Sequence, residues 1–285
     1  MKKSLLVGSF IYFSLPIISM ETDIESTYFI EERDALFTAF DYDDIQEMKN
    51  LLESNQSLAN STDDHDRPIL NYTVKYSSID YVQLLIDYGA DVNKIERYGP
   101  QNTALSVAFS SNNPFDPYPI TDYLEKAKLL IKHGAQVNKK IDLLLYYCIH
   151  LKNAIPILEF LLENNANINP PNSDLLHDAL SIHNPKLLPF LLEKGADPNI
   201  QEKRSKNTPL HIAASLSNFI ATRLLLQYGA NRHIKNHDGR TPLDLANAIN
   251  KNSCHDLFEV IRLLKEKQTI HHKEIIDHEK KLTNR

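Results

Sequence analysis

Glycine and cysteine are both scarce in this chain. Only seven glycines occur among its 285 residues, and none of them lies in a phosphate-binding loop or a dinucleotide fingerprint. The Gly-x-Ser-x-Gly nucleophile elbow and the His-Glu-x-x-His zinc motif are missing too. The sequence therefore predicts no catalytic residue, no bound metal and no cofactor.

Long apolar runs are also lacking, and the longest one lies near the N-terminus. Lys2 and Lys3 precede an interrupted apolar stretch over residues 5–18, and Glu21 opens a polar segment behind it. The stretch is too short for a comfortable membrane span, and the charged–apolar–polar order is that of a signal peptide. We expect residues 1–20 to be cleaved and the protein to be exported, periplasmic or secreted, without stable membrane insertion. The alternative is a cytoplasmic or N-terminally anchored protein.

A repeated phrase, Leu-Leu-x-x-Gly-Ala-x-x-Asn, is the main feature that the chain does contain. Its clearest copy covers residues 191–199, and a phrase returning at a nearly fixed period is the signature of a repeat architecture. Related copies recur every 30–45 residues, at 85–93, 130–138, 161–169 and 225–233.

A second phrase lies upstream of the first, and in the regular copies it begins 21 residues before the glycine of the first, as from Thr208 to Gly229. Thr-Pro-Leu-His-Ile-Ala at residues 208–213 is the best copy, and 241–246 follows it closely. Partial copies lie at 103–108 and 174–179, and the same offset identifies weaker ones starting at Asp34, Pro68 and Leu144. The chain therefore holds about seven copies.

These phrases resemble those of the ankyrin repeat. The resemblance implies an all-α fold, in which antiparallel helix pairs with projecting β-turn hairpins stack into a solenoid. We assign residues 34–268 to the solenoid, 21–33 to an N-terminal cap segment and 269–285 to a charged C-terminal capping helix or tail. Polar caps of this kind keep a repeat stack soluble.

Residues at the ends of the expected helices support helix pairs independently. Thr or Asp opening the second phrase is a helix N-cap, and Pro209 and Pro242 suit the first helical position. Glycine or asparagine in left-handed backbone is expected to close the second helix of a pair. The residues in that position are Gly89, Gly134, Gly195, Gly229, Asn55 and Asn165.

Apolar spacing predicts the buried face of one helix, at Ile220, Ala221, Leu224 and Leu225. The two cysteines, Cys148 and Cys254, fall three repeats apart. Helix layers are about 8–10 Å apart, whereas a disulfide needs Cα atoms within about 7 Å. We expect two free thiols and a fold stabilised by stacking alone.

Charge is distributed unevenly along the chain, whose net charge is −6. Residues 21–100 carry 18 acidic and 6 basic side chains, whereas residues 201–285 carry 9 acidic and 15 basic ones. The net negative charge argues against a nucleic-acid partner. The asymmetry is either an ordinary solvated surface or a dipolar one that orients a charged partner.

Binding residues are expected where the repeats deviate or project. About ten extra residues at 110–119 hold three prolines together with Phe115 and Tyr118, which are candidate partner anchors unless both rings fold back on their own helices. The resemblance implies that hairpin tips and first helices line a concave partner surface. The candidates at the tips are Asp64, His65, Tyr98, Lys203, Arg204, Lys206, His237 and Arg240.

Histidines are numerous, but we assign none of them to a metal. His177 and His211 occupy the repeat's own histidine position, and the resemblance implies that they tie hairpins together by hydrogen bonds. His271, Glu274 and His278 share one helical face in the tail. Nothing there supplies second-shell partners, so we interpret this face as a solvated charged surface.

We expect a monomeric, non-catalytic module that binds a protein partner through its hairpin tips and concave helix face. One alternative is an inhibitor or scaffold of an envelope or host protein. Another is an enzyme with a site in the 110–119 insertion or in the tail.

Overall fold

The computed structural model describes residues 18–110, 120–151, 153–171, 174–182, 184–249 and 255–265. These residues contain no β-strand, and their one isolated β-bridge joins Thr62 to Pro68. The chain divides into two compact units, Met1–Asp91 and Val92–Arg285. The 110–119 insertion apart from Ser110, the tail 269–285 and Cys254 lie outside the described residues.

The first unit consists of two helix pairs joined by a short 3-10 helix. Helix α1 packs on α2 and helix α3 packs on α4, with η1 between the pairs. Leu36, Met48, Leu70 and Leu85 are among its buried residues. The elements are α1 (Ile18–Asp41), α2 (Ile45–Ser54), η1 (Gln56–Asn60), α3 (Ile69–Tyr76) and α4 (Ile79–Asp87).

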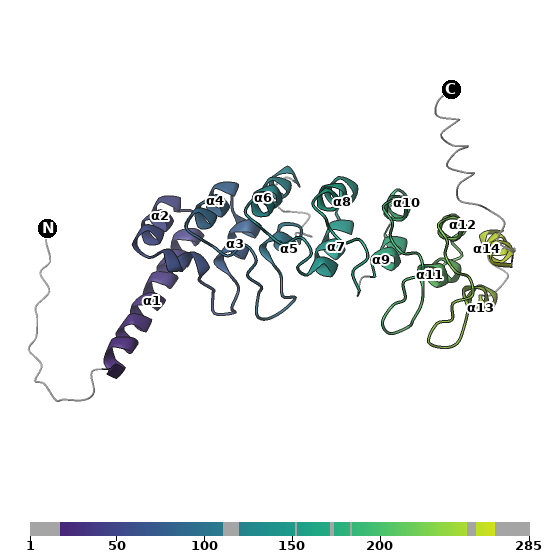
Figure 1. Ribbon diagram of the computed structural model, residues 1–285, viewed down its shortest axis with the longest axis horizontal. Coiled ribbons are helices and arrows are strands. Elements are labelled where there is room, and N and C mark those ends of the chain that lie inside the picture. Colours follow the sequence, from purple (N-terminus) through teal and green to yellow (C-terminus); the bar gives the residue numbers. More distant parts are fainter. Residues whose placement is uncertain are drawn as a thin grey trace, which may run out of the picture. The chain divides into compact units, whose positions relative to one another are not determined.

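The described residues of the second unit form five helix pairs in two layers (Figure 1). The first helices are α5 (Ala104–Ala108), α7 (Ile141–Ile149), α9 (Leu175–Ser181), α11 (Pro209–Ser215) and α13 (Pro242–Ala248). The second helices are α6 (Ile120–Lys132), α8 (Ala154–Glu163), α10 (Leu187–Glu193), α12 (Phe219–Gln227) and α14 (His255–Lys265).

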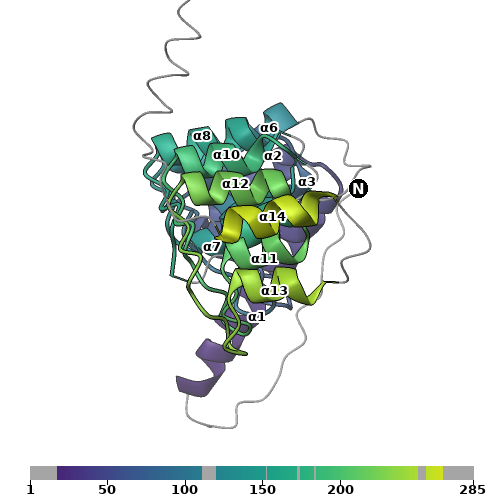
Figure 2. The same ribbon diagram turned by 90° about the vertical axis from the view of Figure 1, so that its right-hand side faces the viewer.

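Each first helix of this unit packs on the first helix of the next pair, from α5 through to α13. The second helices α8, α10, α12 and α14 pack in the same order, and Figure 2 shows α8, α10 and α12 one behind another above α11 and α13. Loops that follow the second helices project beyond the first-helix layer (Figure 1). Because one pair cannot bury its own apolar face, the core is a continuous strip between the layers.

The predicted face of α12 is only partly right. Ala221 and Leu225 are buried, but Ile220 is 68% exposed and Thr222 is buried instead. Successive residues lie about 100° apart around a helix, so once Ala221 and Leu225 face the core, Ile220 points away from it. Spacing alone identified the helix but not its rotation.

Helix starts follow the predicted capping chemistry in three of the strongest copies. Thr103 and Thr241 each form a capping box with the residue three positions later, and the Thr208 N–H donates to His211 Nδ1 at 3.1 Å. Pro209 and Pro242 occupy the predicted first helical positions.

Two aspartates predicted as N-caps behave differently. Asp174 stands at the N-cap position of α9, but its side chain makes no capping bond. The prediction for Asp34 is wrong, because Asp34 lies inside α1. No glycine or proline interrupts residues 18–41, so one helix runs through the region expected to be a separate cap segment at 21–33.

Helix ends agree with the prediction at five of six positions. The four predicted glycines have φ between 86° and 90°, and Asn165 has φ 63°. The prediction for Asn55 is wrong, since its φ is −148°. Asn55 instead caps η1 by accepting the Ser57 N–H, and it donates to Glu32 at 2.8 Å.

In five places an asparagine at or beside the end of the repeated phrase bonds to the following repeat, whereas the copy at 225–233 ends in His233. The Asn199 Nδ2 group donates to the Gly229 carbonyl at 3.2 Å, and Asn199 Oδ1 accepts the Asn231 N–H at 2.7 Å. Within each unit the same pair of bonds is made by Asn60, Asn93, Asn138 and Asn169. Each bond pairs a backbone group of the turn that follows a second helix, which would otherwise lack a protein partner.

The free thiol predicted at Cys148 is confirmed. Cys148 lies unpaired in α7 with no exposed surface, and burial raises the pKa of its thiol. A protonated, buried thiol behaves as a small apolar side chain.

We call Asn60, Asn93, Asn138, Asn169 and Asn199 the asparagine ladder. Removing one of them should weaken the coupling between neighbouring repeats. We expect Asn199→Ala to lower the free energy of unfolding by about 1–2 kcal/mol, because two hydrogen bonds are lost. Urea unfolding followed by circular dichroism measures the change. Asn231→Ala is the matched control, since the Asn231 side chain accepts only a local bond from the His233 N–H. Equal losses in the two variants would contradict the ladder's role.

Candidate partner-binding surface

Two hairpins of the second unit carry five of the ten predicted binding residues. We call residues 201–207 hairpin A and residues 235–240 hairpin B; they precede α11 and α13 respectively. In hairpin B, the Asn236 N–H donates to the Arg240 carbonyl at 2.9 Å, and Gly239 has φ 73°, which suits glycine in a turn.

Hairpins A and B are hydrogen-bonded to one another. The His237 N–H of hairpin B donates to the Ser205 carbonyl of hairpin A at 2.8 Å. The Asn236 side-chain amide donates to Asn207 Oδ1 at 3.0 Å. The two tips therefore form one surface with a defined spacing.

That surface is rich in basic side chains. The acidic residues beside them are Glu202, which accepts a hydrogen bond from the Ser205 hydroxyl, and the exposed Asp238. The exposed basic and histidine side chains that the sequence singled out here are Lys203, Arg204, Lys206, His237 and Arg240. The structure thus brings five of the ten predicted residues together.

Two buried histidines hold these hairpins on the first helices, as the resemblance implied. The His211 Nε2–H donates to the Arg240 carbonyl at 3.0 Å, since Nδ1 already accepts the Thr208 N–H. His177 Nε2 lies 2.9 Å from the Asn207 carbonyl. Burial lowers the pKa of His211, and the bond to Arg240 only partly offsets this effect. The imidazole of His211 therefore prefers its neutral form.

Asp64 and His65 lie at the tip of a hairpin in the first unit. Asp63 organises this tip by accepting the His65 N–H and the Arg67 side chain. Burial opposes ionisation of Asp63, but these bonds and one from Tyr72 outweigh it and lower its pKa. Asp64 pairs with Arg33 of α1 at 3.1 Å, so this tip is braced against the first helix.

The remaining predicted residues are not grouped with these. Tyr98 belongs to a hairpin of the second unit before α5, is 62% exposed and lies beside the Arg97 guanidinium. Phe115 and Tyr118 lie outside the described residues.

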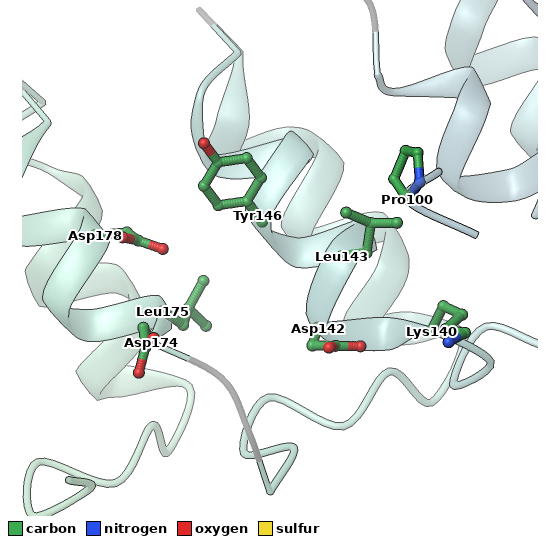
Figure 3. A pocket seen from close by; sticks show the side chains of 8 residues that line it. All are labelled: Pro100, Lys140, Asp142, Leu143, Tyr146, Asp174, Leu175 and Asp178. Carbon is green, nitrogen blue, oxygen red and sulfur yellow. The ribbon is translucent and has the colours of Figure 1, made fainter. Parts of the chain in front are cut away.

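A hollow that the sequence did not predict lies between α7 and α9. It encloses about 280 Å³, and Figure 3 shows side chains of both helices facing it. Its walls are Pro100, Leu143, Tyr146 and Leu175, and its rim carries Asp142, Asp174 and Asp178. We call this site the α7–α9 hollow. Its signal in the sequence was weak. Asp174 and Asp178 lie about one helical turn apart, and Asp174 stands where the better copies of the second phrase have threonine.

The carboxylates of the α7–α9 hollow differ in environment. Asp142 and Asp174 are exposed, whereas Asp178 is half-buried. Burial raises the pKa of Asp178, and the neighbouring Asp174 carboxylate adds to the rise. Lys140 borders the hollow at the end away from Asp178 (Figure 3) and donates to Gln101 Oε1 at 2.6 Å. Removing a carboxylate from water without a cation is costly.

Neither a metal centre nor a membrane span is found in the described part of the chain. No group of three or more histidine, cysteine, aspartate or glutamate side chains there is placed to hold a metal ion. Across the same residues, no helix combines the length and apolar character needed to cross a membrane.

Comparison with known proteins places the fold. A family model for ankyrin repeats, in three copies, matches residues 176–274. A putative ankyrin repeat protein of Rickettsia felis is 41% identical over 118 residues, which are 36% of this chain and 49% of that protein. The chain thus spans about half the length of this relative.

Similar solved structures agree with the match to the ankyrin-repeat family model. The ankyrin repeat domain of human ASB11 superposes with a TM-score of 0.58 at 23% identity, over 84% of this chain and 99% of that one. The ankyrin repeat domain of Bcl-3 gives a TM-score of 0.60 at 20% identity, over 81% and 98%. The chain contains ankyrin repeats, and its fold is an all-α ankyrin-repeat solenoid. Domains of this fold generally mediate protein–protein interaction and are typically not catalytic.

The neutral state of His211 makes part of the stability depend on pH. Its pKa is lower in the folded chain than the unfolded value of about 6.5. The unfolded chain therefore takes up the proton first, and stability falls as pH drops through this value. Wild type should lose more unfolding free energy between pH 7.5 and 5.5 than His211→Gln, as measured by urea titration. Identical losses would contradict this reading.

Proposed function

We propose that this chain is a non-catalytic protein-binding module whose partner contacts hairpins A and B and the adjoining first helices. The observation that carries the proposal is the pair of hydrogen bonds that lock the two tips together. A pre-organised surface loses little entropy on binding. The basic side chains on it favour an acidic protein segment, because charge complementarity speeds encounter and fixes orientation.

Nucleic acid is a less suitable ligand for this chain. The net charge is −6, so a polyanion approaching the basic tips also meets the repulsion of the whole molecule. A protein partner can present acidic residues to the tips and other groups elsewhere. We propose that the protein acts as a monomer built from about seven repeats.

Export is part of the proposal and rests on the N-terminal sequence. Lys2 and Lys3, the apolar stretch at 5–18 and the polar residues after it support a signal peptide over residues 1–20. The mature protein would then act in the periplasm or outside the cell. Sequencing the N-terminus of the native protein tests this point, and a chain that keeps residues 1–20 would contradict it.

Reversing the charge of the tips should abolish partner binding. We expect Lys203→Glu/Arg204→Glu/Arg240→Glu to weaken the affinity for a partner, captured by cross-linking from native extract, at least tenfold. The loss should shrink at high salt, because exposed charges are screened. Isothermal titration calorimetry with the purified partner gives the affinity.

The matched control reverses three charges on the second-helix side. Lys132, Lys186 and Arg223 are exposed on or beside α6, α10 and α12. Their replacement by glutamate changes the net charge equally and should leave the affinity unchanged. If both triple variants bind as wild type, hairpins A and B are not the partner surface.

A further inference from the structure

The α7–α9 hollow has the size and lining of a pocket for one side chain. Its volume of about 280 Å³ lies just below the range of roughly 300–1,000 Å³ typical of pockets for small molecules. Leu143 and Leu175 supply apolar walls, and Tyr146 adds an aromatic ring that is 46% exposed. Apolar walls with a charged rim match a long side chain with a charged end.

In the described part of the chain, the side chains of Asp142, Asp174 and Asp178 form no hydrogen bond or ion pair. Asp174 stands at an N-cap position yet makes no capping bond, whereas the threonines in this position of other repeats do. Within the described residues, no lysine or arginine forms an ion pair with Asp142, Asp174 or Asp178. The nearest lysine in the lining, Lys140, donates to Gln101 instead.

A metal ion does not account for these carboxylates. Across the described residues no three or more histidine, cysteine, aspartate or glutamate side chains are placed to hold a metal ion, which needs ligands within about 2–2.6 Å. Carboxylates spread around a hollow suit an extended cation better. A planar guanidinium has five N–H donors and can bond to several carboxylates while its face stacks on an aromatic ring.

Tyr146 is held in place to receive such a group. The His150 ring lies 4.6 Å from the Tyr146 ring between centroids, and His150 Nδ1 lies 2.7 Å from the Tyr146 carbonyl. Only Lys139 and Lys140 separate Asn138 from α7, so no long hairpin precedes this helix.

We propose that the α7–α9 hollow binds an arginine side chain from an extended segment of the protein partner. This inference rests on the proposed function and adds the chemistry of a second contact. The His177–Asn207 hydrogen bond joins α9 to hairpin A, so both sites belong to one surface of the second unit. The partner segment would carry an arginine for the hollow and acidic residues for hairpins A and B.

A random twelve-residue peptide library displayed on phage tests the proposal with the full chain as bait. We expect selected peptides to contain arginine, and synthetic copies to lose at least tenfold in affinity when this arginine becomes citrulline. Citrulline keeps the shape of the side chain and removes its charge. Lysine in its place should retain part of the affinity. Fluorescence anisotropy of labelled peptides measures each dissociation constant.

Variants of the protein locate the bound arginine. Asp142→Asn/Asp178→Asn should weaken peptide binding at least tenfold. Adding Tyr146→Ala to this double variant should weaken binding further. The control Glu159→Gln/Glu193→Gln removes two exposed carboxylates from α8 and α10 and should bind as wild type. Circular dichroism checks that each variant remains folded.

The outcomes separate this inference from the proposed function. Peptides that bind without arginine, or that bind the aspartate variant normally, overturn the arginine pocket. So does a selection that yields no peptide. The proposed function fails separately, when the hairpin charge reversals leave binding of the full-length partner intact.

Discussion

The hydrogen bond from each ladder asparagine to the next repeat is the contact on which the architecture depends. Its amide donates to the carbonyl of the residue that closes the next helix pair, and its oxygen accepts an N–H two residues further on. Both partners are backbone groups of the turn that follows the second helix. Where such an asparagine is present, its side chain thus fixes the distance to the following repeat. The glycine or asparagine that ends each second helix in left-handed backbone sets the direction in which the chain continues. Helix faces then meet in register.

Because both layers of stacked helices and their closing turns build the scaffold, the tips of the hairpins carry few structural obligations. Hairpins A and B are held on the first helices by the bonds of His177 and His211 to the Asn207 and Arg240 carbonyls, and they are held to one another by the bonds of Asn236 and His237. Most of their side chains are exposed, and six of the exposed ones are basic or histidine: Lys203, Arg204, Lys206, Lys235, His237 and Arg240. A rigid support under variable tips is the general arrangement by which scaffolds carry binding residues.

Sequence reasoning succeeded where one residue has one local role. Thr241 caps its helix and Gly195 closes another, because capping and left-handed backbone depend on a few neighbouring atoms. It failed where the outcome depends on longer range. Asp34 was read as a cap although nothing interrupts α1 upstream, and Asn55 serves η1 rather than a left-handed turn. The α7–α9 hollow could not be predicted, since residues from two repeats and a hairpin meet there only after folding.

The repeat formed by α9 and α10 shows how a departure from the repeated phrase can create a site. Where Thr208 donates to His211, Asp174 makes no capping bond and His177 Nδ1 is buried without a hydrogen-bond partner. A buried unsatisfied polar atom costs about 1–3 kcal/mol, so this repeat begins its first helix less favourably than its neighbours. What the substitution adds is a carboxylate on the rim of the hollow. Local rules broken without a structural gain tend to mark function, and here the broken rule and the unpaired charge fall on the same residue.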